Sequence, residues 1–433
     1  MYHAGMSGLV QHYLDQILAE HAGDTSGELA GYIPELAAVD PNGFGLSISS
    51  SDGFIYESGD ASSEFTIQSI SKPFTYALAL SCNGREAVDA RIGVEPSGEA
   101  FNEISVDSAT KAPKNPMINA GAIAAAAMIP GDTPDQRFER IREFYSGCAG
   151  RQLDIDVQVY QSEKATGARN RAIAYMLQSL GALDGDPEDI LDVYFRQCSF
   201  RVTSTDLARM AATLARGGFN PLTGRRVVAA DVVQRTLSVM VTCGMYDGAG
   251  DWVSAVGMPA KSGVGGGILA VLPGQLGIGV YSPRLDAKGN SVRGILVCRS
   301  LSQRLGLHFL NVSRESRSVI RANYDAADGV RVFELHGDLL FSGAEQVVRT
   351  VLRQRERFAV AVMDLSRLDD TDNAARELLA ELRDALLALG KQCLFVDPDG
   401  VVGARASQPG FSEAVFTSFD DAVAAAKGYV ELV

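Results

Sequence analysis

The sequence has few residues that bind metals or form disulfides, and those it has are scattered. The 433-residue chain contains six cysteines and five histidines. No Cys-x-x-Cys pair and no His-Glu-x-x-His pattern occurs, so neither a zinc site nor a redox dithiol is indicated. We therefore expect a reducing, cytoplasmic location and a reaction that uses neither a metal nor an organic cofactor.

Long hydrophobic runs and a basic charge surplus are also missing. The longest run of small apolar residues, AGAIAAAAMI at 120–129, is too short to cross a bilayer. The N-terminus has no basic segment followed by an apolar core, so no signal peptide is expected. A net charge of −14 disfavours nucleic acid, whose phosphates require a basic surface. We expect neither a nucleic acid nor a membrane as a partner.

The length of the chain predicts more than one domain, because a single core rarely grows to this size. Within residues 1–311, strand patterns stand near both ends and helical patterns fill much of 115–240. One hairpin is predicted around the turn at Ser51–Gly53 and another over 261–283. Strands from both ends would form one antiparallel sheet flanked by helices, with a helical subdomain between them. This is an α+β layout.

The character of the sequence changes after residue 311. Residues 312–328 are polar and charged without a sustained period, which is typical of a linker. Strand and helix patterns then alternate over 329–433, which predicts a small, mostly parallel α/β domain.

The stretch EFTIQSISKPFTYALAL at 64–80 predicts a strand that runs into a helix, with Ser69 and Lys72 at the junction. Residues three apart share a helix face, so the two side chains can meet. Such a serine becomes a nucleophile only if the lysine is desolvated enough to accept its proton. A capping serine beside a surface lysine is the alternative. The same spacing recurs at Ser108 and Lys111, before a segment that cannot be helical, so the pattern alone is weak.

A second element, Lys261–Ser262–Gly263, begins a predicted strand late in the first domain. The two elements in this order resemble the penicillin-recognising serine hydrolases, which have a β-lactamase/transpeptidase-like fold. Their middle Ser-Asp-Asn element is missing here, and Ser81–Asn83 lies too close to Ser69 to replace it. The residues therefore indicate a serine hydrolase of this fold that is not a β-lactamase.

Longer blocks of sequence resemble the serine-dependent glutaminase family. They stand in family order over residues 30–310 and include YIPELA at 32–37, FTIQSISKPF at 65–74, NPMINAGAI at 115–123, SEKATGARNRAIAY at 162–175, CGMYDGAGDW at 243–252 and PAKSGVGGGI at 259–268. The resemblance implies a homo-oligomer that hydrolyses L-glutamine to L-glutamate and ammonia.

The resemblance also implies a role for individual residues. Ser69 would be the nucleophile of a glutamyl-enzyme ester, Lys72 its base and Tyr246 a proton relay, with Lys261 in support. The substrate-binding residues that it implies are Tyr32, Ser69, Asn119, Glu163, Asn170, Tyr194, Tyr246 and Val264. Glu163 would pair with the substrate ammonium, and the backbone N–H groups of Val264 and Ser69 would form the oxyanion hole.

The last hundred or so residues resemble a STAS domain, the anti-sigma-factor-antagonist fold, through their element order and the stretch VMDLSRLDDTDNAARELL at 362–379. The family's Asp-Ser-Ser-Gly loop, where a serine can be phosphorylated, corresponds to Asp372, Asn373, Ala374 and Ala375. Because neither serine is present, we expect no phosphorylation there. The partner of this domain stays open.

Two other functions are compatible with the same residues. One is a different serine amidohydrolase on this fold that acts on another small amide. The other is a catalytically silent glutamine sensor that signals through the STAS-like domain. The presence of every implied catalytic residue disfavours the sensor.

Overall fold

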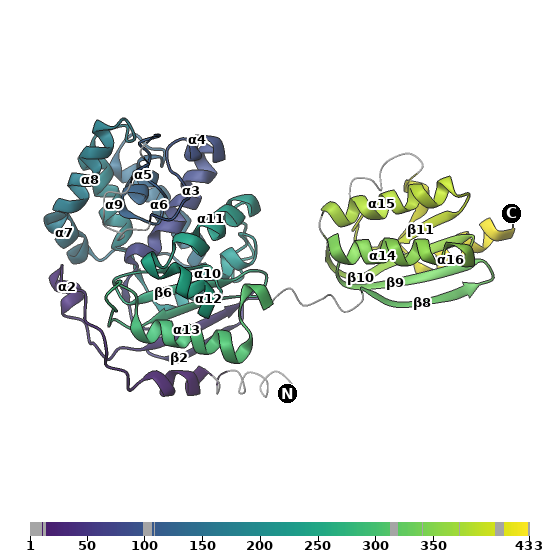
Figure 1. Cartoon of the computed structure of the whole chain (residues 1–433), viewed down its shortest axis with the longest axis horizontal. Helices are drawn as coiled ribbons and strands as arrows, with labels where there is room; N and C mark the ends of the chain where they lie inside the picture. The colour runs from purple at the N-terminus through teal and green to yellow at the C-terminus, as the bar shows by residue number, and fades with distance from the viewer. Residues whose placement is uncertain are drawn as a thin grey trace. The chain divides into compact units, whose positions relative to one another are not determined.

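The computed structural model describes residues 11, 14–97, 106–107, 109–311, 319–339, 341–371, 373–402 and 411–431. The chain divides into two compact units, Met1–Val312 and Ser313–Val433 (Figure 1). Within the described ranges, no helix combines the length and the apolar character needed to cross a membrane.

A five-stranded antiparallel sheet organises the first unit. Its strand order is β2 (Ile55–Gly59), β1 (Gly45–Ser50), β7 (Leu276–Tyr281), β6 (Gly267–Leu272) and β5 (Ala260–Ser262). Both predicted hairpins are confirmed, since β1 pairs with β2 and β6 pairs with β7. β1 also pairs with β7, so strands from the two ends of the unit lie side by side, as predicted.

Helices cover both faces of this sheet. Along β6, Leu269 and Val271 face α10 (Ser204–Ala215), whereas Ile268 and Ala270 face α13 (Val292–Leu305). This alternation follows from the period of two in a strand. α10 approaches β7 so closely that a Cβ at Gly279 would lie 2.0 Å from the backbone oxygen of the first residue of α10, so only glycine fits there.

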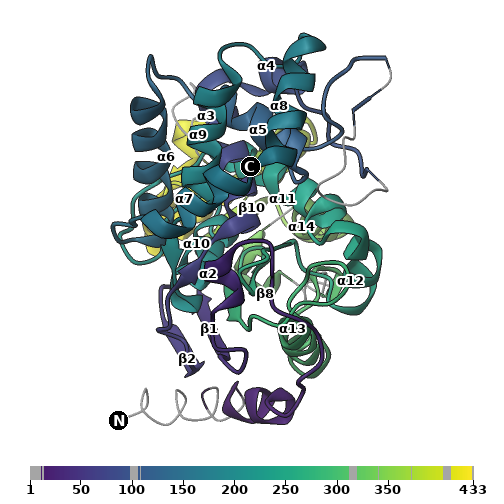
Figure 2. The ribbon, with the colours of Figure 1, turned by 90° about the vertical axis from the view of Figure 1, so that its left-hand side faces the viewer.

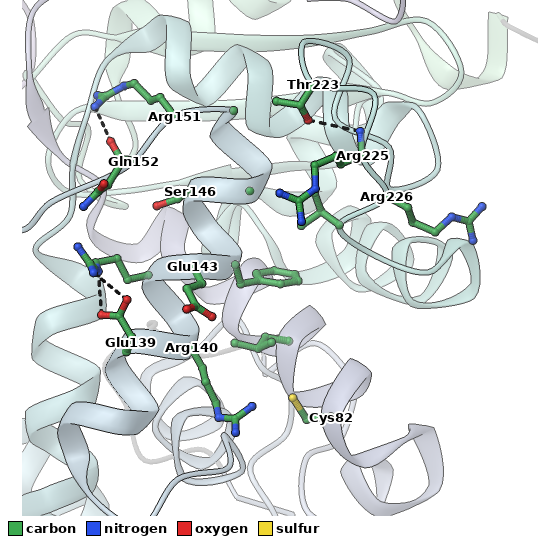
Figure 3. Close-up of a pocket in the computed structure, with 16 residues that line it drawn as sticks. Cys82, Glu139, Arg140, Glu143, Ser146, Arg151, Gln152, Thr223, Arg225 and Arg226 are labelled. Atoms are coloured by element: carbon green, nitrogen blue, oxygen red, sulfur yellow. Dashed lines mark hydrogen bonds and ion pairs between the residues drawn. The ribbon is translucent and has the colours of Figure 1, made fainter.

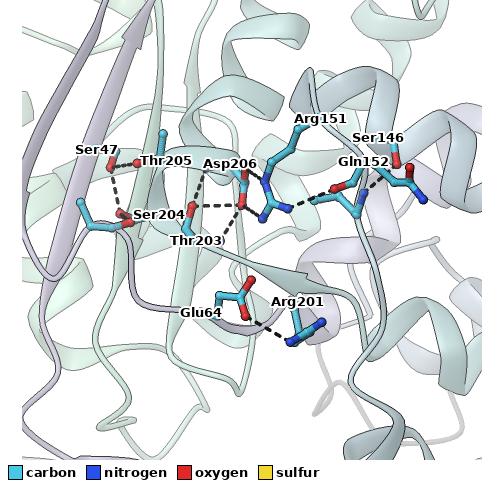
Figure 4. Close-up of polar contacts among 12 residues, drawn as sticks. Ser47, Glu64, Ser146, Arg151, Gln152, Arg201, Thr203, Ser204, Thr205 and Asp206 are labelled. Atoms are coloured by element: carbon cyan, nitrogen blue, oxygen red, sulfur yellow. Dashed lines mark hydrogen bonds and ion pairs between the residues drawn. The ribbon is translucent and has the colours of Figure 1, made fainter.

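Polar contacts fix the N-terminus of α10 on the sheet (Figure 4). Thr203 and Asp206 form a capping box, which satisfies two backbone N–H groups at the helix start. The Ser47 hydroxyl on β1 lies 2.8 Å from that of Ser204 and 3.1 Å from that of Thr205. α10 is therefore held in register with the sheet as well as packed against it.

The predicted helical middle is confirmed and forms a subdomain at one end of the unit, with the sheet and α13 at the other (Figure 2). The remaining helices of the unit with printed bounds are α2 (Pro34–Ala37), α3 (Ser71–Asn83), α4 (Arg85–Asp89), α5 (Asn119–Ala127), α6 (Pro134–Ala149), α7 (Val157–Thr166), α8 (Ala168–Ser179), α9 (Pro187–Cys198), α11 (Ala230–Cys243) and α12 (Ala249–Ala255). α5 is buried almost throughout and packs against α3, α8 and α9. Its small side chains allow those three helices to approach it closely.

The second unit is a mostly parallel sheet, as predicted, and helices cover both of its faces. Its strand order is β12 (Val415–Phe416), β11 (Gln392–Val396), β10 (Val360–Thr371), β9 (Val330–Leu339) and β8 (Ile320–Ala327). Only the β8–β9 pair is antiparallel among these. Along β10, Ala361 and Met363 face α14 (Phe341–Arg353) and α15 (Asn373–Ala388), and Val360 and Val362 face α16 (Phe419–Glu431).

The predicted linker at 312–328 is wrong for its second half. Residues 320–327 form β8, which pairs with β9, while 312–318 lie outside the described residues. β8 is an edge strand whose polar side chains pair across the sheet. Arg321 lies 3.0 Å from Glu334, and Arg331 donates to Asn323 at 2.9 Å. An edge strand of this kind lacks the apolar alternation by which strands are predicted.

Candidate active site

Ser69 lies where the chain turns from a short strand into a long helix. β3 (Phe65–Thr66) leads into a 3₁₀ turn at Gln68–Ile70, and α3 begins at Ser71. Pro73 falls in the first turn of α3, where a missing N–H costs no hydrogen bond. Ser69 is 7% exposed, so it lies just beneath the surface at the N-terminal end of a helix. The helix dipole favours negative charge at such a position.

Two strained residues border Ser69. Gln68, which precedes it, has φ 49°, and Tyr246, whose hydroxyl hydrogen-bonds the Ser69 side chain, has φ 53°. A non-glycine residue in this left-handed region costs about 1–3 kcal/mol, and such strain is concentrated at functional sites. The surrounding packing therefore holds both neighbours of Ser69 in conformations that they would not adopt alone.

Lys72 is completely buried beside this turn. Its Nζ donates a hydrogen bond to Asn119 Oδ1 at 2.6 Å. Burial lowers the pKa of Lys72 to about 8, and its electrostatic interactions with Cys198 and Glu163 oppose this shift only in part. A sizeable fraction of this amine is therefore neutral near pH 8, which a proton acceptor requires.

Tyr246 packs against β5, the strand that carries Lys261. Its hydroxyl donates to the Ser262 carbonyl at 3.1 Å, and Lys261 Nζ donates to the same carbonyl at 2.7 Å. Lys261 Nζ also lies 3.9 Å from the centre of the Tyr246 ring. Burial and the charge of Lys72 hold the pKa of Lys261 well below its usual range. Lys261 thus supports Tyr246 rather than reaching the cavity beside Ser69.

The loop between β5 and β6 packs directly against the backbone that leads to Ser69. A Cβ at Gly265 would lie 2.5 Å from the Thr66 carbonyl oxygen, so this approach requires glycine. The close contact brings Val264, the residue before Gly265, to the edge of the same cavity as Ser69.

A cavity of about 280 Å³ brings most of the predicted site residues together. Those that line it are Tyr32, Ser69, Asn119, Glu163, Asn170, Tyr194 and Val264. Lys72, Lys261 and Tyr246 do not line the cavity. Lys72 contacts the lining residue Asn119, and Tyr246 contacts the lining residue Ser69. The volume is near the lower end of the range for small-molecule sites, which suits a ligand the size of an amino acid.

The acidic end of the cavity is Glu163, on α7. The Tyr32 hydroxyl lies 3.1 Å from Glu163 Oε1 and 3.2 Å from Gln68 Oε1. Although the Tyr32 side chain is 49% exposed, its hydroxyl points inward. Burial raises the pKa of Glu163, and the hydrogen bonds from Tyr32 and Gln68 oppose that rise. A cationic group bound beside Glu163 would favour its charged form.

The amide of Asn119 connects the buried lysine with the cavity. Its oxygen accepts from Lys72, and its Nδ2 donates to Asn170 Oδ1 at 2.9 Å. Asn119 opens α5 and Asn170 lies on α8, so three helices meet at this chain of contacts.

Residues that were not predicted also line the cavity: Gln68, Thr166, Gly167, Arg169 and Cys198. Gln68 stands directly before Ser69, and that position was a usable signal. Cys198 gave no signal, since it was one of six scattered cysteines. Burial raises its pKa to about 12, so its thiol keeps its proton.

The chain has clear relatives among known proteins. A family model described as Glutaminase matches residues 27–310, and a STAS domain model matches residues 321–426. Glutaminase 1 of Bradyrhizobium diazoefficiens is 47% identical over 397 residues, which cover 87% of this chain and 64% of that protein. A glutaminase of Corynebacterium efficiens is 44% identical over 395 residues, which cover 91% of this chain and 93% of that protein.

A solved structure agrees with these matches along nearly the whole chain. The crystal structure of Mglu in its glutamate form has a TM-score of 0.84 and 40% sequence identity, covering 90% of this chain and 99% of that one. This chain therefore spans nearly all of the Mglu chain and of the Corynebacterium protein, but less than two thirds of the Bradyrhizobium protein.

Proposed function

The chain belongs to the glutaminase family and carries a C-terminal STAS domain, and from that premise we propose that it hydrolyses L-glutamine to L-glutamate and ammonia. Ser69 attacks the side-chain amide carbon of glutamine, and Lys72 in its neutral form accepts the seryl proton. The amide oxygen becomes an oxyanion held by the backbone N–H groups of Ser69 and Val264.

The intermediate then breaks its carbon–nitrogen bond. The proton on Lys72 passes through the Tyr246 hydroxyl to the departing nitrogen, which leaves as ammonia. A glutamyl ester on Ser69 remains. Water attacks this ester, its proton returns by the same route, and the ester bond breaks to give glutamate and free Ser69. The Tyr246 hydroxyl is hydrogen-bonded to the Ser69 side chain, which supports its role in this relay.

The same cavity offers a partner for each polar end of glutamine. Glu163 pairs with the α-ammonium group, and Asn119, Asn170 and Tyr194 bind the α-carboxylate through neutral hydrogen bonds. Tyr32 fixes the Glu163 carboxylate. These contacts place the side-chain amide toward Ser69.

The observation that carries the proposal is that Lys72 is fully buried and donates a hydrogen bond to Asn119. Asn119 in turn donates a hydrogen bond to Asn170 in the cavity. Its lowered pKa and its place three residues after Ser69 match the needs of a general base. The same contacts would let bound substrate influence the base directly.

The test is ammonia release from glutamine, asparagine and a γ-glutamyl peptide, measured in parallel. We expect release from glutamine to exceed that from asparagine by at least about 10²-fold in kcat/KM, because a shorter side chain cannot reach Ser69 while its α-groups stay bound. A preference for another amide would mean a different amidohydrolase. Binding of glutamine without any release would mean a sensor.

We further propose that the protein is a cytoplasmic homo-oligomer, on the strength of the family resemblance and the cysteine pattern. Light scattering on the purified chain tests the assembly. A particle with the mass of one 46.0 kDa chain would contradict it.

A further inference from the structure

Four buried polar side chains form a closed ring of hydrogen bonds beneath the first turn of α3. The Tyr145 hydroxyl donates to the Ser71 carbonyl at 2.7 Å and lies 2.6 Å from Thr75 Oγ1. Thr75 donates to Gln197 Oε1 at 2.9 Å, and Gln197 Nε2 donates to Ser71 Oγ at 3.5 Å. All four residues are 0% exposed, and none of them lines the cavity beside Ser69. We call these four residues the polar ring.

The polar ring joins three helices at the place where the nucleophile and its base are attached. Ser71, Tyr145 and Gln197 belong to α3, α6 and α9, respectively. In the chain, Ser71 stands between Ser69 and Lys72. Hydrogen bonds to Ser71 therefore act on the turn that sets the separation of the nucleophile from its base.

Stability alone does not account for the polar ring. It lies inside an apolar core, where the rings of Phe74 and Phe200 pack against Tyr145. Buried polar groups contribute little net stability even when each has a partner, and apolar residues of similar volume often stabilise a core as well. A satisfied polar network instead selects one arrangement of the elements that it joins. The polar ring is therefore better suited to fixing geometry than to adding stability.

Apolar packing leaves part of the contact between α3 and α6 incomplete. The two helices border a surface hollow of about 760 Å³ (Figure 3). Leu78 on α3 and Phe144 on α6 line this hollow. Because a hollow offers few atoms to the side chains that line it, dispersion there does little to fix the rotation of α3. The polar ring supplies directional contacts between the same two helices.

The backbone just before the nucleophile is strained and needs support from its surroundings. Gln68 has φ 49°, a conformation that persists only where neighbouring structure holds it. The segment that follows Gln197 supplies part of that support. The Ile67 N–H donates to the Phe200 carbonyl at 2.8 Å, and β3 pairs with β4 (Arg201–Val202). Gln197 extends the support from the residues before the nucleophile to those after it.

We propose that Gln197 is a positioning residue for the reaction. Through Ser71 and Thr75 it fixes the first turn of α3. Ser69 and Lys72 then keep the separation that proton transfer requires, and a misplacement of about 1 Å can cost about 10²-fold in rate. Gln197 itself lies outside the cavity lining. This inference rests on the Ser69–Lys72 chemistry proposed above, and the measurements below distinguish failure of one from failure of the other.

The first test replaces the Gln197 amide with an apolar side chain of similar volume. Gln197→Leu should lower kcat about tenfold or more and leave KM for glutamine within about twofold, because it disturbs the reacting groups and not the contacts that bind substrate. The Kd of L-glutamate from isothermal titration calorimetry should also stay within about twofold. Gln178→Leu, the same change on the exposed surface of α8, is the matched control and should alter none of these values.

The second test uses the hydrogen bond that Gln197 shares with Thr75. Thr75→Val removes the hydroxyl but keeps the shape, so it should lower kcat as Gln197→Leu does. Thr75→Ser retains the hydroxyl and should keep kcat within about threefold of the unaltered chain. Because Gln197→Leu and Thr75→Val break the same hydrogen bond, the double variant should be little slower than either single variant. Circular dichroism checks that each variant is folded, and if Gln197→Leu does not fold, the two Thr75 variants decide.

A third measurement is independent of glutamine. A fluorophosphonate reacts with an activated serine and does not require a glutamine-shaped ligand. It should label Ser69 about tenfold more slowly in folded Gln197→Leu and Thr75→Val than in the unaltered chain. If the unaltered chain is labelled at Ser69 but releases no ammonia from glutamine, the proposed substrate is wrong, and these labelling rates still decide the role of Gln197.

Several results would overturn the inference. An unchanged kcat and labelling rate in folded Gln197→Leu would show that the amide has no part in the reaction. Equal losses in Thr75→Ser and Thr75→Val would mean that packing matters and the hydroxyl does not. A rise in KM and in the glutamate Kd, with kcat unchanged, would make Gln197 a support of the binding cavity. Absence of labelling at Ser69 in the unaltered chain would refute both the Ser69–Lys72 chemistry and this inference.

Discussion

The first unit contains the pattern Ser-x-x-Lys twice, at Ser69–Lys72 and at Ser108–Lys111, and the surroundings of the two lysines are opposite. Lys72 is completely buried and hydrogen-bonded to Asn119, and its pKa is lowered to about 8. Lys111 is exposed, has φ 62° and follows a turn at 109–110, while Ser108 lies outside the described residues. The spacing is the same in both places. Burial is what turns one lysine into a possible base, because desolvation disfavours its charged form.

The largest expected effect separates the two serines. Ser69→Ala should lower kcat by about 10⁴-fold or more, because the covalent route disappears. Ser108→Ala should leave kcat within a factor of a few. Steady-state ammonia release measures both. Labelling by an electrophilic glutamine analogue, mapped by peptide mass, should occur on Ser69. Equal effects of the two changes would refute the assignment of the nucleophile.

The two lysines give the next comparison. Lys72→Arg should lower kcat/KM by about 10³-fold, because a guanidinium stays protonated and cannot accept the seryl proton. Lys111→Arg should have no measurable effect.

The pH dependence sharpens the comparison of the lysines. Because the active form of Lys72 is neutral and its pKa is about 8, kcat/KM should rise with pH and level off above that value. Measuring kcat/KM from pH 6 to pH 10 tests this. Substantial activity in Lys72→Arg, or the same rising limb in that variant, would rule out the role of general base.

Charge recognition gives a smaller effect. Glu163→Gln should lower kcat/KM for glutamine, because the bound ammonium loses its partner. The expected loss of transition-state binding energy is about 2–4 kcal/mol. Most of that penalty should vanish with a glutamine analogue that lacks the α-amino group. The matched control is Glu35→Gln. Glu35 accepts a hydrogen bond from Ser162, which stands directly before Glu163 on the same helix. If the analogue suffers as much as glutamine, Glu163 supports the fold or the chemistry instead.

The next comparison concerns the free energy of unfolding and pairs a buried tyrosine with an exposed one. The Tyr145 hydroxyl donates to the Ser71 carbonyl at 2.7 Å and lies 2.6 Å from Thr75 Oγ1, all within the core beneath Ser69. Tyr145→Phe should lower the free energy of unfolding by about 1–3 kcal/mol, because two buried partners lose a hydrogen bond. Tyr324→Phe, on the exposed edge strand of the second unit, should cost about 0.5 kcal/mol or less. Urea denaturation of each variant measures the difference.

The smallest effect is expected from removing the second unit. A chain that stops near residue 312 should fold and keep its activity within a factor of a few, because every proposed site residue precedes that point. The second unit should fold by itself only in a fragment that begins near residue 313. A fragment that begins at residue 329 lacks β8 and exposes the edge of β9. Circular dichroism and steady-state kinetics test both fragments. Loss of activity in a folded 1–312 fragment would make the STAS domain part of the working enzyme.

Much of the fold was predictable because local pattern determines local structure. The turn at Ser51–Gly53, the strand-to-helix junction at Ser69 and the alternating elements after residue 329 each have a clear signature in sequence. β8 did not, since an edge strand buries little and needs no apolar period. The match of the STAS model from residue 321 agrees with the structure on this point.

The sequence predicted which residues line this cavity better than it predicted their contacts with one another. Family blocks pointed to Glu163, Asn119 and Tyr246, and the structure brings all three close to Ser69. That Asn119 accepts from Lys72 could not be read from sequence, because the two residues stand 47 positions apart and meet only when α3 packs on α5. Gln68 was passed over although its position directly before Ser69 was a usable signal.

The sequence by itself determined most of the helices and strands, which family the chain resembles and which serine has a lysine three residues away. Only the tertiary structure decided that Lys72 is buried while Lys111 is not, and that Lys261 lies under Tyr246 rather than in the cavity. The physical reason is that periodicity and turn chemistry act over a few neighbouring residues. Burial, and with it the pKa of an amine, is set by atoms that distant segments bring together.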